Sequence, residues 1–505
     1  MSLAVVFSRA SLGIGAPLVS VEVHISNGLP AFNIVGLPEA SVKEARDRVR
    51  SALLNGNFTF PAAHITVNLA PADLPKEGGR FDLAIAIGIL VASRQLPPTR
   101  LAGCEFLGEL ALTGAIRPIL GSLPAVLAAQ AAGRILILPG ANSQEAGLIT
   151  TAQVHTCDHL LQLSAWLAGQ QELPLAQAPE PMAEPEWSAD LQDVLGQQTG
   201  KRALEIAASG QHHLLLLGPP GTGKSMLASR LPGILPPLSD AEAQQTAAIH
   251  SIGGLQREWT KWRDRPFRTP HHTASAVALV GGGSQPRPGE ISLAHNGILF
   301  LDELPEFDKR VLDSLREPLE TGCITISRAA RQVEYPARFQ LIAAMNPSPC
   351  GHVDDKQRRS SPEQILRYLS RLSGPFLDRF DLTVEIPLLP KGALSGPCDR
   401  GETSRTIRER VLRTQQRQLA RSGKLNALLD SREIEQHCQL SAQDAQFLEE
   451  AIHQLGLSLR AWHKILRVAR TVADMGQEPA IQRRHLAEAL GYRAMDRLLK
   501  RLHIS

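Results

Sequence analysis

A glycine-rich octapeptide near the middle of the chain constrains the fold more than any other feature. Residues 218–225 read GPPGTGKS; they follow the apolar run 213–217 and precede a helix-compatible segment. Small residues let consecutive backbone N–H groups wrap phosphate oxygens, helped by the positive end of the following helix. The pattern therefore predicts a strand, a phosphate-binding loop and a helix, as in a nucleotide-binding α/β domain.

The side chains of this loop have separate expected tasks. Lys224 is expected to neutralise the β and γ phosphates of ATP, and Ser225 to bind Mg2+. The alternative is a glycine-rich turn with an incidental lysine, but the strand before the loop and the helix after it favour the phosphate site. The predicted nucleotide-binding residues are Gly218, Pro219, Pro220, Gly221, Thr222, Gly223, Lys224 and Ser225.

Two later apolar runs end in polar side chains that suit the same chemistry. The run 297–301 leads into Asp302 and Glu303, and the run 339–345 leads into Asn346. Parallel strands bring their carboxyl ends to one edge of a sheet, where ligands gather. Asp302 is expected to hold Mg2+, Glu303 to act as general base on water, and Asn346 to orient that water. The alternative for the carboxylates is a helix N-cap and a surface glutamate.

One arginine stands in an apolar and acidic setting. Residues 376–382 read FLDRFDL, with Arg379 at the centre. A planar, permanently charged group there suggests a defined anionic partner, which in a ring is the neighbour's γ phosphate. The alternative is an ion pair with Asp378 or Asp381.

The length of 505 residues suggests about three domains. Val19, Val21, Val23 and Ile25 recur at every second position and predict a strand with one buried face, and the first part reads as α+β. A proline-rich stretch indicates a linker, short apolar runs indicate a parallel sheet, and helical patterns from about Ser404 indicate an all-α lid. The predicted boundaries are 1–170 for the α+β domain, 171–188 for the linker, 189–390 for the ATPase core and 391–505 for the lid.

Individual elements of the first domain follow from the same patterns. We expect helices over 39–54, 81–93 and 159–167, and strands over 64–69 and 106–112.

Composition limits the other possibilities. No apolar run approaches the roughly twenty residues of a membrane span, and the first residues do not read as a secretion signal, so we expect a cytoplasmic protein without a membrane partner. The six cysteines form no CxxC pair, which argues against disulfides and a closed zinc site. A net charge of +3 does not decide whether nucleic acid binds.

Several long strings resemble the YifB/ComM family, in the magnesium-chelatase-like branch of the AAA+ ATPases. They are VKEARDRVRSAL from Val42, NLAPADLPKEGGRFDL from Asn68, GELALTGAIRP from Gly108, FRTPHHTAS from Phe267, PGEISLAHNGILFLDELPEF from Pro288 and LSGPFLDRFDL from Leu372. Many relatives carry a zinc-binding cysteine cluster after Asn346; here only Cys350 remains, so no stable zinc site is expected.

The resemblance implies roles that the residues alone do not. It implies a homo-hexamer in which Arg379 is an arginine finger given in trans, Asn346 is sensor 1 and Arg460 is sensor 2. It also implies an ATP- and Mg2+-dependent DNA helicase that drives branch migration while single-stranded DNA is integrated during natural transformation. The first domain further resembles the Lon-protease-like, ribosomal-S5-like domain, but its loop Gly78–Asp82 lacks the serine a peptidase needs.

A predicted hairpin supplies candidates for DNA contact. Residues 323–335 read as two short strands around a turn that carries Arg328 and Arg331, followed by Arg338. Cationic tips facing a ring pore can hold phosphates of single-stranded or branched DNA. The alternative is a hairpin with solvated arginines.

Two other functions use the same ATP motifs. A magnesium-chelatase-like subunit is disfavoured by the fused first domain and by the lack of a DxSxS motif. A protein-remodelling ATPase is possible, although no aromatic pore loop is evident. The pair His271–His272 has no third ligand at zinc spacing, so a packing role is expected for it.

Overall fold

The computed structural model describes residues 2–180, 189–255, 258–283, 286–328, 331–351, 360–389 and 401–504. It divides into two compact units, each assembled from separate stretches of chain. Unit 1 comprises Met1–Glu184, Asp240–Trp262 and Ser327–Tyr335; unit 2 comprises Pro185–Ser239, Arg263–Ile326 and Pro336–Ser505. The predicted domain boundaries at 188 and 390 lie outside the described residues, and the four predicted segments stay a prediction.

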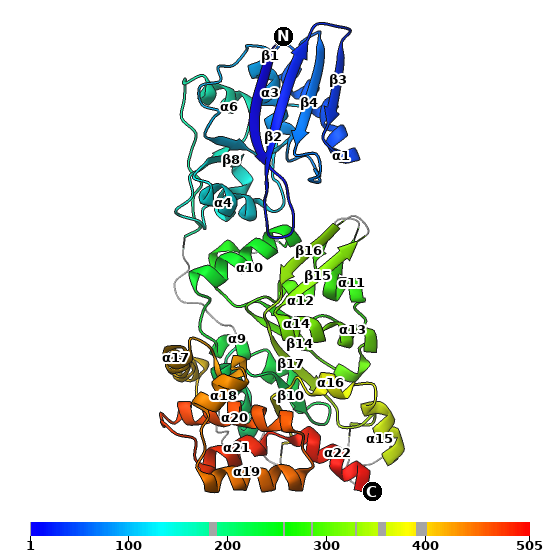
Figure 1. Ribbon diagram of the computed structural model, residues 1–505, viewed down its shortest axis with the longest axis vertical. Helices are drawn as coiled ribbons and strands as arrows, with labels where there is room; N and C mark the ends of the chain where they lie inside the picture. Colours follow the sequence, from blue (N-terminus) through cyan, green and yellow to red (C-terminus); the bar gives the residue numbers. More distant parts are fainter. Residues whose placement is uncertain are drawn as a thin grey trace. The chain divides into compact units, whose positions relative to one another are not determined.

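Unit 1 is built on a seven-stranded mixed sheet (Figure 1). Its order is β3-β4-β2-β1-β5-β8-β9, with antiparallel pairing of β1 with β2 and of β2 with β4, and parallel pairing elsewhere. Val19, Val21 and Val23 of β2 are fully buried, as the alternating pattern predicted. The strands are β1 Ser2–Arg9, β2 Leu18–Ser26, β3 Ala31–Val35, β4 His64–Ala70, β5 Cys104–Phe106, β8 Ile135–Pro139 and β9 Val154–Cys157.

Helix α3 packs against β1 and β2, and it is buried on nearly every side. Helix α10, from the middle of the chain, packs on α4, where Gly121 N donates to Ser251 O at 3.1 Å. The helices of unit 1 are α1 Ala40–Lys43, α2 Ala45–Asn55, α3 Asp82–Ala92, α4 Ser122–Ala131, α5 Ser143–Ala146, α6 Leu160–Leu167 and α10 Asp240–Gly253. The predictions for 81–93, 159–167 and strand 64–69 are confirmed.

Two expectations for unit 1 were wrong in detail. The helix predicted over 39–54 is divided into α1 and α2 by the single residue Glu44, whose φ of −65° and ψ of −19° remain helical. The strand predicted over 106–112 is also divided, into β5 and the short β6 (Glu109–Leu110), which pairs with β7 (Ile116–Arg117). Between them Gly108 donates to Arg80 O at 3.0 Å, so its backbone bonds a loop instead of a strand.

Unit 2 contains a five-stranded parallel sheet with the order β11-β14-β17-β10-β18. The three predicted strands are confirmed as β10, β14 and β17, and the predicted hairpin is confirmed as β15–β16. The strands are β10 Leu214–Leu217, β11 Phe267–Arg268, β14 Ile298–Leu301, β17 Gln340–Met345 and β18 Leu382–Glu385, with a small sheet formed by β12 Gly281–Gly282 and β13 Arg287–Pro288. The hairpin of β15 Cys323–Arg328 and β16 Arg331–Pro336 begins and ends in unit 2, while its segment Ser327–Tyr335 is counted in unit 1.

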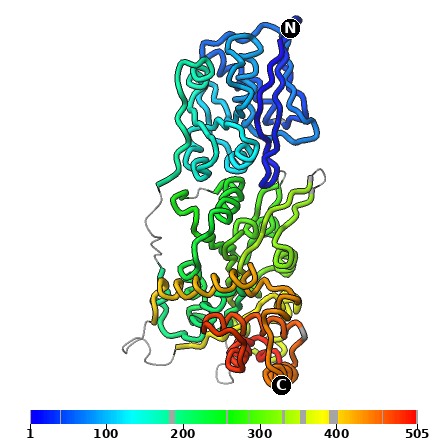
Figure 2. Tube along the Cα trace, turned by 60° about the vertical axis from the view of Figure 1, so that its left-hand side comes forward, coloured from blue at the N-terminus to red at the C-terminus, as the bar shows by residue number. Residues whose placement is uncertain are grey.

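Helices surround this sheet and continue to the end of the chain. The predicted helical region from about Ser404 is confirmed; Figure 2 shows these helices in orange to red. Ile465 and Ala469 of α20 share one buried core with Leu214 and Leu216 of β10. The helices are α7 Gln198–Gly210, α8 Lys224–Ala228, α9 Leu231–Ile234, α11 Ala276–Val280, α12 Glu290–Leu293, α13 Lys309–Ser314, α14 Arg316–Thr321, α15 Pro362–Leu369, α16 Gly374–Leu377, α17 Ser404–Ser422, α18 Ser431–His437, α19 Ala442–Leu455, α20 Leu459–Met475, α21 Arg483–Gly491 and α22 Ala494–Ile504. No helix in the described ranges is long and apolar enough to cross a membrane.

Candidate nucleotide-binding site

The loop between β10 and α8 leaves space where a phosphate can lie. Gly221 and Gly223 have φ angles of 77° and 87°, which only glycine adopts readily. A Cβ atom on either residue would meet no heavy atom within 4 Å. The loop is thus shaped for close approach to a ligand rather than for packing against protein.

Lys224 begins α8 and bends back over this loop. Its Nζ donates to Gly218 O at 2.8 Å, to Pro219 O at 2.7 Å and to Asn346 Oδ1 at 3.2 Å. Burial lowers the pKa of Lys224, and the Asp302 carboxylate acts against that shift. An ammonium group satisfied only by neutral oxygens can exchange them for phosphate oxygens, which form stronger charge-assisted bonds.

Oxygen atoms suited to Mg2+ converge beside the loop. Ser225 Oγ donates to Asp302 Oδ2 at 2.5 Å, and Glu303 N donates to Asp302 Oδ1 at 2.9 Å. Hydroxyl and carboxylate oxygens are the ligands that Mg2+ takes in nucleotide sites, so these residues fit the ion. Glu303 has the left-handed backbone φ of 52°, a strained conformation of the kind that clusters at functional sites.

Two contacts at this site were not anticipated from the sequence. His272 Nδ1 lies 3.5 Å from Glu303 Oε2, so one member of the histidine pair flanks the candidate base. Gln197 Nε2 donates to Thr222 O at 3.1 Å and to Pro387 O at 2.8 Å. These two bonds hold the phosphate loop against the segment that follows β18. The adjacent histidines were a visible signal for the first contact; no local pattern marks Gln197, since its partners are 25 and 190 residues away.

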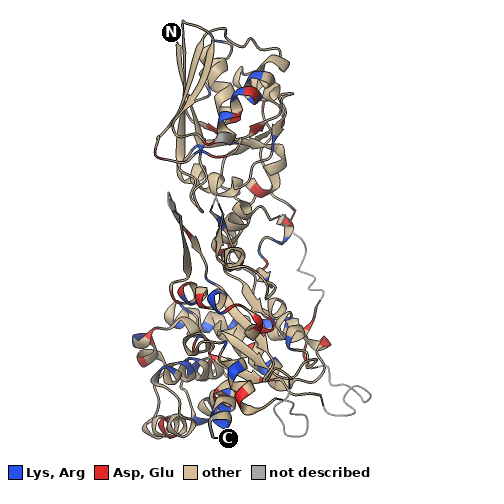
Figure 3. Cartoon of the chain, turned by 90° about the vertical axis from the view of Figure 1, so that its right-hand side faces the viewer, with Lys and Arg blue, Asp and Glu red and all other residues tan. Residues whose placement is uncertain are grey.

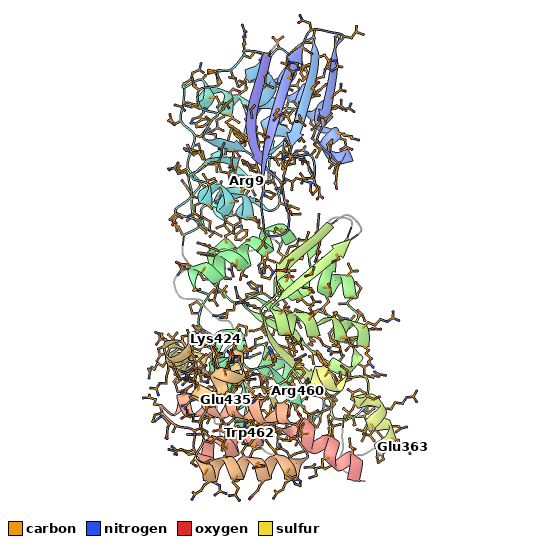
Figure 4. All side chains as sticks on the ribbon, in the orientation of Figure 1. Arg9, Glu363, Lys424, Glu435, Arg460 and Trp462 are labelled. Carbon is orange, nitrogen blue, oxygen red and sulfur yellow. The ribbon has the colours of Figure 1, made fainter. Side chains whose placement is uncertain are left out.

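Arg379 and Arg460 form a second group of charges. Arg460, on α20 (Figure 4), has Nη1 3.9 Å from Asp378 Oδ2 and a side chain that is 74% exposed. The alternative of an Arg379 pair with Asp378 or Asp381 is wrong for this structure: Arg379 pairs with Glu320 of α14. Asp381 instead faces His212 at 3.4 Å.

Further positive charge surrounds Arg379. Burial, together with the charges of Arg316 and Arg460, lowers the pKa of Arg379. Its Nε is buried and meets no acceptor among the described residues. Three guanidinium groups near one another favour an anion at this place.

The DNA-contact candidates fall on or after the β15–β16 hairpin. Arg328 ends β15 and Arg331 begins β16, but the side chains of both lie outside the described part of the chain. Arg338 is exposed, and its backbone N–H donates to His295 Nδ1 at 3.0 Å. Figure 3 shows many Lys and Arg residues on the helices of unit 2 and few on the large sheet of unit 1. The prediction that no stable zinc site follows Asn346 falls mostly on residues 352–359, which lie outside the described residues.

The parallel sheet, the open phosphate loop and the helical C-terminal region define a P-loop fold of the AAA+ type. Family descriptions match most of the chain: "Magnesium chelatase, subunit ChlI" over residues 190–394, "Subunit ChlI of Mg-chelatase" over 21–142, and "Magnesium chelatase, subunit ChlI C-terminal" over 401–493. The chain therefore belongs to the YifB/ComM family of magnesium-chelatase-like proteins.

Individual relatives agree with this assignment. The chain is 59% identical to the competence protein ComM of Haemophilus influenzae, over 99% of each chain. It is 56% identical to YifB of Escherichia coli, over 99% of this chain and 98% of that protein. The magnesium-chelatase 38 kDa subunit of Cereibacter sphaeroides is 26% identical over 38% of this chain and 57% of its own length.

Proposed function

We propose that this chain hydrolyses ATP and uses the energy to move DNA strands. The observation that carries the ATPase part is the convergence of Lys224, Ser225, Asp302 and Asn346 around a loop with open space at Gly221 and Gly223. Each of these side chains suits one part of a nucleoside triphosphate with its ion.

The proposed chemistry assigns a task to each group. Lys224 exchanges its carbonyl partners for β- and γ-phosphate oxygens, while Ser225 and Asp302 hold Mg2+, which neutralises phosphate charge when bound. Glu303 accepts a proton from the attacking water, and Asn346 orients that water. His272 restricts the position of the Glu303 carboxylate until the carboxylate binds the attacking water.

The second group of charges is proposed to act across a subunit interface. Arg460 lies 3.9 Å from Asp378, the residue before Arg379, and its charge acts on Arg379, so both arginines can serve the γ phosphate held by a neighbouring subunit. A contact of this kind uses different surfaces on the two subunits, and repeated contacts of this kind close into a ring. The expected ring is a homo-hexamer.

The DNA part of the proposal comes from the family. A relative 59% identical over the full length is named a competence protein, and the resemblance implies branch migration during natural transformation. Arg328, Arg331 and Arg338 are the proposed phosphate contacts. The first domain is proposed to be Lon-like without peptidase activity, and the protein to act in the cytoplasm.

The test is ATP-dependent strand displacement from a labelled three-stranded branched DNA. Wild type should displace the strand, and Glu303→Gln should bind ATP yet displace little, because the general base contributes about 10²- to 10⁴-fold. Displacement by Glu303→Gln at the wild-type rate removes the base assignment. Wild-type ATPase activity without displacement or DNA stimulation favours instead the magnesium-chelatase-like or protein-remodelling function, the former supported by similarity to a chelatase subunit.

A further inference from the structure

Glu320 is the one described carboxylate paired with Arg379, and no sequence motif marked it. It lies in the last turn of α14, three residues before β15. Arg379 lies just after α16, in a different part of unit 2. The pair therefore joins the proposed arginine finger to the segment that leads into the β15–β16 hairpin.

The junction between Glu320 and the hairpin is tightly bonded. Thr321 Oγ1 lies 2.9 Å from Glu317 O and 3.0 Å from Cys323 O, so its single proton can bond either carbonyl, and it accepts from Cys323 N at 3.3 Å. This hydroxyl therefore links the end of α14 to the start of β15. Ala337 N donates to Gly322 O at 2.8 Å, which closes the base of the hairpin. These bonds connect the base of the hairpin to the turn of α14 that carries Glu320, a path by which movement of one can reach the other.

The pair is placed so that another anion can replace it. The Glu320 side chain is 56% exposed and that of Arg379 25% exposed, and ion pairs this open to water contribute little to stability. Arg316 and Arg460 add positive charge around Arg379, so the site retains a preference for an anion after Glu320 leaves. A phosphate carries more negative charge than one carboxylate and offers more acceptor oxygens.

We propose that Glu320 occupies Arg379 in place of the neighbour's γ phosphate, and that movement of the β15–β16 hairpin withdraws it. Glu320 is then a positioning residue that restrains ATP hydrolysis until the hairpin engages its polymer. The proposal rests on the proposed role of Arg379 in the ring. Arg379 then has Arg460 near it, 3.9 Å from Asp378, to help hold the incoming phosphate.

The experiment compares ATP turnover of Glu320→Gln and wild-type full-length rings, with and without single-stranded DNA. Turnover without DNA should rise about two- to fivefold, the range expected for losing an exposed ion pair. Turnover with DNA should stay near wild type, so stimulation by DNA should fall. The matched control is Glu317→Gln, an exposed glutamate one turn earlier on α14, which should behave as wild type in both conditions.

Arg379→Ala separates this proposal from the function on which it rests. If Glu320 acts through Arg379, Glu320→Gln should change nothing in an Arg379→Ala background. Unchanged or lower turnover of Glu320→Gln without DNA overturns the restraint, and an equal rise with and without DNA overturns the link to the hairpin. Wild-type turnover of Arg379→Ala alone instead overturns the proposed arginine finger, whatever Glu320→Gln does.

Discussion

Each unit contains a glycine loop that leads into a helix, and the two loops use their charged residues differently. In unit 1, Gly78 and Gly79 precede α3; in unit 2, the loop ending at Gly223 precedes α8. A Cβ atom on Gly79 would lie 2.5 Å from the Glu109 side chain, whereas one on Gly223 would meet nothing within 4 Å. Protein meets the first loop at Gly79 but not at Gly78, whereas no protein atom would meet a Cβ at either Gly221 or Gly223 of the second loop.

The charges around the unit 1 loop have partners within that unit. Lys76 is fully buried and donates to Pro71 O, and Arg80 Nη2 donates to Leu120 O at 2.5 Å. Asp82, at the start of α3, accepts from Arg48 Nε at 2.7 Å. Buried charges satisfied in this way hold chain segments in place.

The charges around the unit 2 loop have partners that a nucleotide can replace. Lys224 is held by two carbonyls and one amide oxygen, and Ser225 by the Asp302 carboxylate. Both loop lysines donate to neutral oxygens, so the partners alone do not separate them. The comparison teaches that a lysine beside a glycine loop is a ligand-binding candidate when the whole loop faces open space and further polar side chains suited to the ligand converge on it.

The largest expected difference is between the two loop lysines. Lys224→Ala should lower ATP turnover about 100-fold or more, because it removes a charge aimed at the transferred phosphate. Lys76→Met should lower the melting temperature and leave turnover per folded molecule within about twofold of wild type. Steady-state ATPase assays with thermal unfolding of both variants measure this difference. Equal losses of turnover would show that the unit 1 lysine also serves the reaction.

A smaller effect is expected at the ion pair of unit 1. Asp82→Asn leaves the Arg48 guanidinium, whose side chain is 20% exposed, without its buried carboxylate. Breaking a fully buried pair costs about 3–5 kcal/mol, and the exposure of Arg48 reduces the expected loss to about 1–3 kcal/mol. Urea unfolding measures it, and ATP turnover of the folded variant is the control. A loss of turnover without a loss of stability would move Asp82 from structure to function.

The smallest expected effect concerns pH. Burial lowers the pKa of His213 to about 4, with Asp381 acting against the shift and His212, Lys464 and Arg379 adding to it. The neutral ring accepts from Leu341 N at 3.0 Å. In the unfolded chain the pKa of this histidine is near 6.5, so as the pH falls the unfolded state binds a proton before the folded state does. The stability contributed by neutral His213 is therefore lost between about pH 6.5 and pH 4.

His213→Asn tests that pH dependence, because the amide oxygen can accept from Leu341 N but does not titrate. Wild-type and variant melting temperatures measured from pH 7.5 to pH 4.5 should converge as the pH falls. The ring is only partly buried, so the expected change in relative stability is about 1 kcal/mol. A constant difference across this range would mean that His213 does not titrate on unfolding in that window.

Much of unit 2 could be predicted because its signals are local. Apolar runs ending in Asp302, Glu303 and Asn346 predicted β14 and β17, and the glycine motif predicted the turn between β10 and α8. Gly221 and Gly223 of that turn have positive φ angles, and the motif predicts such glycines without any information about distant contacts. The helical region after Ser404 was visible for the same reason, since helix periodicity is a property of neighbouring residues.

The interruptions in unit 1 were not predictable in this way. The helix over 39–54 is divided only at Glu44, whose backbone angles remain helical, and no residue pattern marks that position. The strand over 106–112 divides because Gly108 bonds the loop at Arg80. At Gly108 a contact 28 residues away in the sequence overrides the local pattern.

The sequence alone determined the chemical groups of this protein: the phosphate loop, the carboxylate pair and the arginine at 379 stand in recognisable order along the chain. Only the tertiary structure decided their partners, such as Glu320 for Arg379, His272 for Glu303 and Gln197 for Thr222. The physical reason is the distance along the chain over which each interaction acts. Backbone conformation and hydrophobic periodicity arise between neighbouring residues. Ion pairs and side-chain hydrogen bonds instead depend on which distant segments the folded core brings within a few ångströms of one another.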